Sequence, residues 1–238
     1  MKRLLFSALI FLSFTVYAQE DLLWDYPVKP GTEEWNKLTL EEKRAACQIP
    51  EDILLIIPTN QLMTLCLQYP FLYDVFAFNN KLTGLDMLFA NFNGIREFSK
   101  REGAAVNYMQ EQYLSDIHSI PDKLNKSSSL GFSFVYQISI LELLLSYSEF
   151  HGNTSQEDQK KILGSLLFGY RAKSKFPEYF QGTGFETNLF ARAHILIKIN
   201  PALSEKFEGI NGSVLASGMV ASAGLIDNMD SLSYELIR

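Results

Sequence analysis

The stretch from Leu130 to Phe150 constrains the fold of this chain most strongly, because it is long, apolar and free of proline. It reads LGFSFVYQISILELLLSYSEF, and its only charged residues are Glu142 and Glu149. The alternation typical of a strand fails at Ile140–Leu141 and at Leu143–Leu145, which predicts a helix despite the early β-branched residues. Apolar side chains fall on all sides of this helix, so a protein core or a membrane must surround it.

The polar residues of the same stretch favour a protein core over a membrane. Glu142 stands at its centre, and serines and a glutamine interrupt the apolar run, which is unfavourable in a bilayer. Elsewhere, short helical segments separated by Pro, Gly or Asn precede longer ones, and no strand pattern recurs. We therefore predict an all-α protein, either an irregular multi-helix bundle or a curved, solenoid-like array of helix pairs, with residues 130–150 as its central buried helix.

The first 18 residues have the pattern of a secretory signal peptide. Lys2 and Arg3 form a basic start, Leu4–Phe14 an apolar core, and Ala18 a small residue at the cleavage position. The alternative, a retained membrane helix, needs an apolar run about twice as long. We expect cleavage after Ala18, release into the periplasm or outside the cell, and no membrane span in the remaining chain.

The remainder divides into an arm and one domain. Residues 19–31 contain two prolines and are predicted to form an extended N-terminal arm, and residues 32–238 a single all-α domain. Capping boxes are predicted at two helix starts, Thr39 with Glu42 and Ser155 with Asp158.

The net charge and the absence of known catalytic and nucleotide-binding motifs argue against several classes of function. The 238-residue chain has a formal net charge of −6 and no basic cluster, so we expect neither nucleic-acid binding nor attraction to anionic membranes. Neutral, apolar or cationic partners suit it better, and its oligomeric state is left open. The chain lacks the zinc-protease motif, the nucleophile elbow, the P-loop and the dinucleotide fingerprint. We predict no cofactor and no metal ion.

Two cysteines, Cys47 and Cys66, follow the expected cleavage site. An even number of cysteines in an exported protein predicts a disulfide, which would link two short helices. The alternative is a pair of buried free thiols that act as small apolar residues. We expect the disulfide because of the compartment, since the spacing says nothing about geometry.

Glu142 is the first candidate for chemistry, because a carboxylate inside an apolar helix must be paired, hydrogen-bonded, protonated or at a pocket. Its plausible partners on later helices are Arg171, Arg192, His194 and Lys198. The structural interpretation is a buried ion pair or an edge position that faces water. The functional interpretation is a pocket acid, with Arg192 orienting a substrate or His194 sharing the catalysis.

Trp24 and Trp35, in or near the N-terminal arm, are the candidate binding residues. An exposed tryptophan there would mark an interaction surface. The alternative is that both rings help to pack the arm onto the body of the protein.

Four segments resemble a pattern in some uncharacterised secreted bacterial proteins: Tyr26–Trp35 (YPVKPGTEEW), Cys47–Leu54 (CQIPEDIL), Tyr69–Pro70 and Phe92–Gly94. The resemblance covers the N-terminal third of the mature chain. It implies bacterial export, and it carries no activity.

Three hypotheses of function follow, in order of preference. The first is a secreted or periplasmic helical protein that binds a protein or peptide partner without catalysis, which an exposed apolar patch or groove with a polar rim would support. The second is a carrier of an apolar small molecule, which requires a continuous void. The third is a small hydrolase-like enzyme, which requires Glu142 to meet His194 or Arg192 in a cleft.

Overall fold

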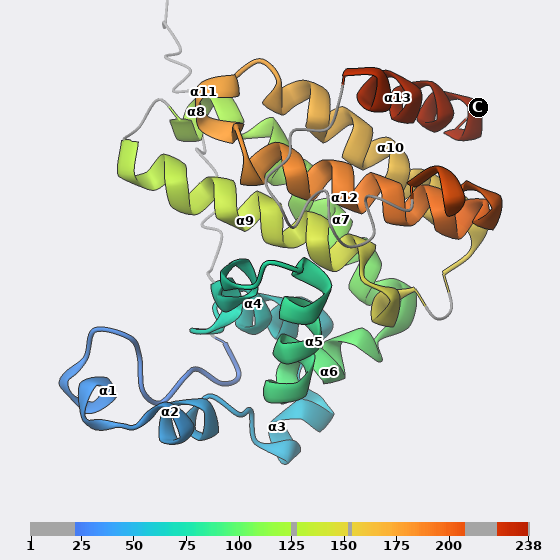
Figure 1. Ribbon diagram of the computed structural model, residues 1–238. Coiled ribbons are helices and arrows are strands. Elements are labelled where there is room, and N and C mark those ends of the chain that lie inside the picture. Colours follow the sequence, from blue (N-terminus) through green and yellow to red (C-terminus); the bar gives the residue numbers. More distant parts are fainter. Residues whose placement is uncertain (1–21, 125–127, 152–153, 208–222, 238) are drawn as a thin grey trace, which may run out of the picture.

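The computed structural model describes residues 22–124, 128–151, 154–207 and 223–237, and every regular element in these ranges is a helix (Figure 1). The predicted all-α class is confirmed, and the arrangement is an irregular helical bundle. The predicted signal peptide, residues 1–18, lies outside these ranges. Within them, no helix combines the length and the apolar character needed to cross a membrane.

The N-terminal half is built from short helices. They are α1 (Glu33–Lys37), α2 (Leu40–Ala46), α3 (Glu51–Ile56), α4 (Thr59–Leu67), the 3-10 helix η1 (Leu72–Ala77), α5 (Lys81–Asn91) and α6 (Asn93–Ser99).

Longer helices follow in the C-terminal half. The elements are α7 (Glu102–His118), α8 (Ile120–Leu124), α9 (Ser128–Ser146), η2 (Ser148–Phe150), α10 (Gln156–Lys173), α11 (Pro177–Phe180), α12 (Thr183–Ile199), η3 (Pro201–Leu203), η4 (Glu205–Phe207) and α13 (Ala223–Ile237).

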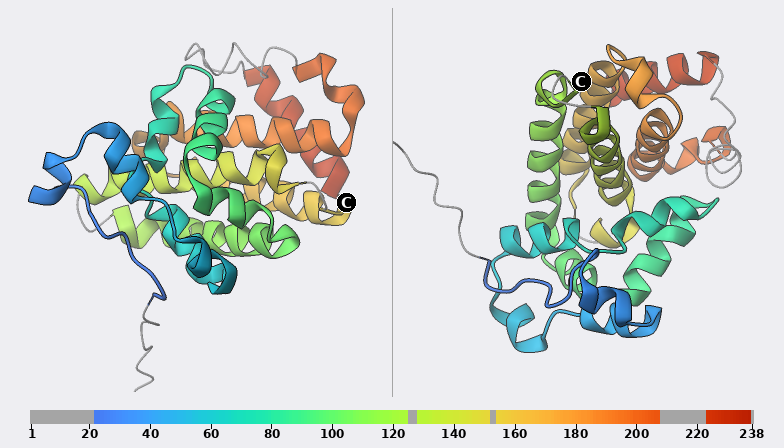
Figure 2. Two further views of the ribbon diagram at one scale, coloured as in Figure 1. Left: turned by 90° about the horizontal axis from the view of Figure 1, so that it is seen from below. Right: turned by 90° about the vertical axis from the view of Figure 1, so that its left-hand side faces the viewer.

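Helix α9 is the buried centre that the sequence predicts. It packs against α7 and α12, α10 packs against both of these helices, and α13 covers α10 and α12 (Figures 1 and 2). Every residue from 138 to 147 is buried, although Tyr136 in the preceding turn is exposed. The helix ends at Ser146, earlier than predicted, because the backbone of Tyr147 is extended.

Both predicted capping residues start helices, and the pair at Thr39 forms a complete capping box. The Thr39 hydroxyl accepts a hydrogen bond from the Glu42 amide, and the Glu42 carboxylate accepts one from the Thr39 amide at 2.8 Å. The Ser155 hydroxyl accepts from the Asp158 amide at 3.1 Å at the start of α10. These contacts satisfy amides that have no partner within the helix.

The short helices form an N-terminal lobe, α1 to α6 with η1, that lies below the long helices in Figure 1. The arm residues 22–31 contain no helix and run along α4, where the Tyr26 hydroxyl donates to the Leu65 carbonyl at 2.7 Å. Helix α4 packs on α7, and α5 packs on α9, so the lobe rests on the bundle.

The structure does not contain the disulfide expected between Cys47 and Cys66, because both are buried free cysteines. Cys47 caps the end of α2 and Cys66 lies in α4, and each side chain fills the core as a small apolar group. Burial raises the pKa of Cys47 to about 11 and also raises that of Cys66.

Candidate functional site

The buried carboxylate of Glu142 lies at the centre of the bundle and accepts four side-chain hydrogen bonds. Its Oε1 accepts from the Tyr113 hydroxyl at 2.8 Å, from the Lys173 ammonium at 2.6 Å and from the Asn188 amide at 2.7 Å. Its Oε2 accepts from the Thr187 hydroxyl at 2.7 Å. These donors come from α7, α10 and α12, so the cluster joins the three helices around α9.

Lys173 supplies the charge that balances Glu142. It is the last residue of α10, and its side chain is fully buried. Its ammonium also donates to the Gly184 carbonyl at the start of α12. Burial lowers the pKa of Lys173, and the neighbouring carboxylate opposes that shift. The pair therefore replaces lost hydration with mutual attraction and further hydrogen bonds.

A glycine makes this cluster possible. A Cβ atom added at Gly169 would lie 1.8 Å from the Tyr113 hydroxyl oxygen, so only a glycine lets that hydroxyl reach Glu142. Glu142 and Lys173 are fully buried, and the donors to the carboxylate come from three different helices. The cluster is therefore suited to holding these helices together.

The structure does not bring the other two catalytic candidates to Glu142. The fully buried Arg192 forms an ion pair with Asp230 at 2.5 Å and donates to the Ser233 hydroxyl at 3.1 Å, which ties α12 to α13. His194 is half-buried and packs against Phe190, with 4.3 Å between the centres of the two rings. Burial lowers the pKa of His194.

The remaining predicted partners of Glu142 also lie elsewhere. Arg171 and Lys198 are exposed, and the Arg171 guanidinium lies over the Tyr234 ring at 4.7 Å. Among the described residues, no group of three His, Cys, Asp or Glu side chains is placed to hold a metal ion.

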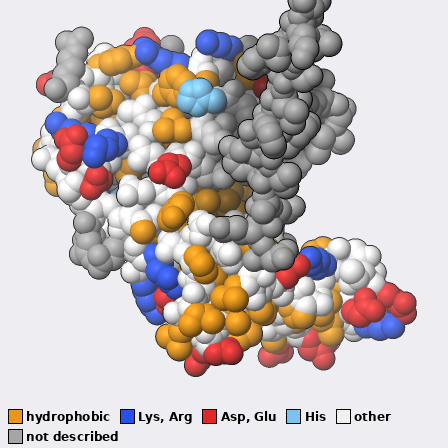
Figure 3. All heavy atoms as spheres, turned by 180° about the vertical axis from the view of Figure 1, so that it is seen from behind, with side chains coloured by type: hydrophobic (Ala, Val, Ile, Leu, Met, Phe, Trp, Pro, Cys, Tyr) orange, Lys and Arg blue, Asp and Glu red, His pale blue; other side chains and the backbone are white. Residues whose placement is uncertain are grey.

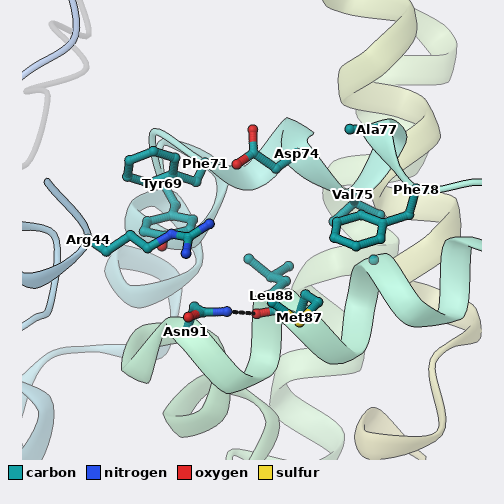
Figure 4. Close-up of a pocket in the computed structure, with 11 residues that line it drawn as sticks. Arg44, Tyr69, Phe71, Asp74, Val75, Ala77, Phe78, Met87, Leu88 and Asn91 are labelled. Carbon is teal, nitrogen blue, oxygen red and sulfur yellow. Dashed lines mark hydrogen bonds between the residues drawn. The ribbon is translucent and has the colours of Figure 1, made fainter. Parts of the chain in front are cut away.

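A pocket of about 350 Å³ opens on the N-terminal lobe, between α2, η1 and α5 (Figure 4). One end carries the Arg44 guanidinium and the Asn91 amide, beside the rings of Tyr69 and Phe71. The other end is apolar. Its lining there consists of Val75, Ala77, Phe78, Gly84, Met87 and Leu88.

Several polar groups of the pocket lack hydrogen-bond or ion-pair partners. The Arg44 guanidinium and the Asp74 carboxylate form no ion pair and no hydrogen bond with any described residue. The Tyr69 hydroxyl is buried and also has no hydrogen-bond partner. The Asn91 amide nitrogen donates to the Met87 carbonyl at 2.7 Å, which leaves its oxygen as an acceptor. The pocket thus combines apolar walls with unused charge and hydrogen-bonding capacity.

Close packing holds the walls of the pocket in place. A Cβ atom at Gly84 would lie 2.6 Å from the Val75 carbonyl oxygen, so this glycine lets α5 approach η1 closely. The Lys81 ammonium donates to the carbonyls of Phe76 and Phe78 at 3.3 and 2.7 Å, which fastens the end of η1 to the start of α5. The Tyr69 ring stacks on Phe92 at 4.0 Å.

Of the two candidate tryptophans, Trp35 borders the pocket. Its ring lies 5.6 Å from the ring of Phe71, which lines the pocket, and the Lys43 ammonium lies over it at 5.4 Å. Trp24 packs edge-on against Tyr26 at 5.0 Å. Both tryptophans are half-buried and pack against the core.

A second hollow, of about 530 Å³, continues the pocket along α2. Both hollows share Arg44 and Asn91, and the second also involves Leu40, Glu41, Ala45 and Gln48. The two hollows adjoin at Arg44 and Asn91, and we refer to them together as the groove.

Hydrophobic side chains are also exposed on the face seen from behind, over the part that holds the first short helices (Figure 3). The most exposed are Leu55 and Ile56 of α3, at 84% and 66%. The hollow beside Leu55 is lined mostly by polar and charged side chains, among them Glu51, Arg96 and Lys100, whereas the pocket at Arg44 joins a polar end to an apolar one. We therefore assign the candidate site to the groove at Arg44.

Sequence reasoning missed most of the residues described above. Lys173 stands among Arg171 and Lys175, and nothing in that run singles out the one that turns inward. Arg44 stands in a helix of alternating charge, where an exposed role is the usual expectation. No protein-family model, curated protein or solved structure matches the chain.

Proposed function

We propose that this chain is an exported helical protein that binds a protein or peptide partner without catalysis. The observation that carries the proposal is the groove at Arg44, where unpaired polar groups adjoin an apolar pocket. A partner would bury one apolar side chain in the pocket and satisfy the polar groups around it. The burial of Glu142 and its four hydrogen bonds support a structural role for that carboxylate and give the enzyme hypothesis less support.

The carrier hypothesis also has less support than peptide binding. The pocket, at about 350 Å³, falls at the lower end of the roughly 300–1,000 Å³ of small-molecule sites. A purely apolar cargo would leave Arg44 and Asp74 without partners while removing water from them, which is unfavourable.

Selection of displayed random peptides on the purified protein tests the proposal. Ala77 lines the pocket, so Ala77→Trp should fill it and weaken the selected peptides by about tenfold or more. The matched control is Ala104→Trp, at an exposed position on α7, which should leave affinity unchanged. The proposal fails if no peptide is selected, or if both variants bind the selected peptides as the unchanged protein does.

Export is tested separately, because it rests on residues 1–18 alone. The intact mass of the protein recovered from the exported fraction should correspond to residues 19–238. A mass that still includes Met1 to Ala18 would contradict cleavage, and recovery only from inside the cell would contradict export.

A further inference from the structure

Arg44 is the feature of the groove that selects a ligand most sharply. Its side chain is half-buried, and its guanidinium lies over the Phe71 ring at 5.8 Å. This contact limits the freedom of the side chain and leaves its N–H donors without a partner among the described residues. A guanidinium held in this way matches the two oxygens of a carboxylate, because both groups are planar and bidentate.

Tyr69 forms a fixed wall at the same end of the pocket. Its side chain is 3% exposed, and its hydroxyl has no hydrogen-bond partner. Burial raises the pKa of Tyr69 to about 12, so the hydroxyl keeps its proton at neutral pH. The ring is fixed by its stack on Phe92, so this wall of the pocket is rigid beside Arg44, while the hydroxyl itself is buried out of reach of a ligand.

The groove also contains acceptors that can bind the backbone N–H groups near the end of a peptide. Asp74 has an unpaired carboxylate, and the Asn91 side-chain oxygen is free, so each can accept a backbone N–H. The apolar end, with Val75 and Phe78, offers space for one side chain (Figure 4). The second hollow, toward Leu40, gives the rest of an extended chain a path along α2.

We infer that the groove binds the free C-terminal end of a peptide or protein whose last side chain is apolar. The terminal carboxylate meets Arg44, the last side chain enters the pocket, and the preceding residues lie along α2. This inference rests on the proposed function, and it adds the chemical class of the partner.

Three small probes test the inference: N-acetyl-alanyl-phenylalanine, the same dipeptide with a C-terminal amide, and free phenylalanine. Binding is followed by the fluorescence of Trp35, in a Trp24→Phe variant that removes the other tryptophan. We expect the free acid to bind roughly tenfold or more tighter than the amide, since hydrogen bonds to charged groups are the stronger ones. The preference should shrink as salt is added.

Substitutions at Arg44 test whether its guanidinium causes the preference for the free acid. Arg44→Gln should abolish the preference for the acid, and Arg44→Lys should restore part of it, because lysine keeps the charge and loses the bidentate geometry.

Two results would overturn the inference. Equal affinity for acid and amide would exclude carboxylate recognition, while peptides selected through the pocket would still support the proposed function. Tighter binding of free phenylalanine than of the acetylated dipeptide would exclude a peptide end as the occupant. If selection yields no peptide at all, the proposed function itself fails.

Discussion

At the scale of single residues, Glu142 and Lys173 depend on each other. Both side chains are fully buried, and each would be an isolated charge without the other. Isolated charges are far more costly in a core than a hydrogen-bonded pair, so loss of one partner is worse than loss of both charges.

We therefore predict that Lys173→Met lowers the free energy of unfolding by about 3–5 kcal/mol. The double variant Glu142→Gln/Lys173→Met should recover part of this loss, because glutamine removes the unpaired charge and keeps an acceptor for Tyr113 and Asn188. Urea unfolding of the single and double variants measures the coupling. Losses that simply add would show that the pair does not act as a unit.

His151 contributes a dependence of stability on pH. Its imidazole is buried, its Nε2 contacts the Leu145 carbonyl at 2.6 Å near the end of α9, and its Nδ1 lies 3.2 Å from the Thr154 hydroxyl. Burial lowers the pKa of His151 to about 4, from an ordinary value of 6.5. Between about pH 6.5 and pH 4, His151 is therefore protonated in the unfolded chain and neutral in the folded chain.

Stability should thus fall as the pH drops from about 6.5 to about 4, by at most about 1.4 kcal/mol per pH unit from this residue. His151→Gln can still donate to the Leu145 carbonyl and does not titrate, so it should flatten the pH dependence. Thermal unfolding between pH 4 and 8 compares the two proteins. Parallel curves would show that His151 does not carry the effect, since His194 titrates in the same direction in both proteins.

At the scale of the helices, close contact between α7 and α10 requires a residue without a side chain. Gly169 of α10 faces the Tyr113 hydroxyl of α7, which passes beside it to reach Glu142. Gly164 lies in the same helix, but the nearest atom to its added Cβ is the Ile237 Cδ1, at an ordinary 3.9 Å. The two glycines form a matched pair for experiment.

Gly169→Ala should destabilise the protein by about 1–3 kcal/mol, because Tyr113 must move away and abandon Glu142. Gly164→Ala should be neutral or stabilising by up to about 1 kcal/mol, because alanine is the better helix former. Chemical unfolding of both variants tests the comparison. Equal destabilisation by the two substitutions would contradict the role of close approach at Gly169.

At the scale of the whole molecule, the sequence predicts the helical class and the buried centre, and for identifiable reasons. The apolar residues of α9 lie on every side of the helix, and capping residues such as Thr39 and Ser155 mark starts locally. These signals lie within one segment. The early end of α9 at Ser146 was not predicted, because the contact of His151 with Leu145 depends on how the chain folds back.

The candidate site was predicted only in part, because it is made by contacts between distant segments. A buried partner for Glu142 was expected, but the choice of Lys173 over Arg192 depends on the direction in which α10 and α12 cross α9. The groove joins Arg44 of α2 to Asn91 of α5, residues whose proximity no local pattern reveals. The disulfide between Cys47 and Cys66 is predicted from the expected compartment alone. The structure instead places both cysteines in the core as free thiols.

The central claim is that ligands bind at the groove of the N-terminal lobe, while the charged cluster in the bundle is structural. The most direct test is a titration of the ¹⁵N-labelled protein with N-acetyl-alanyl-phenylalanine, followed by amide chemical shifts. We predict that the largest changes fall on α2, on residues 69–78 and on the end of α5. Changes centred on Glu142 in α9 and its donors in α12 would contradict the account.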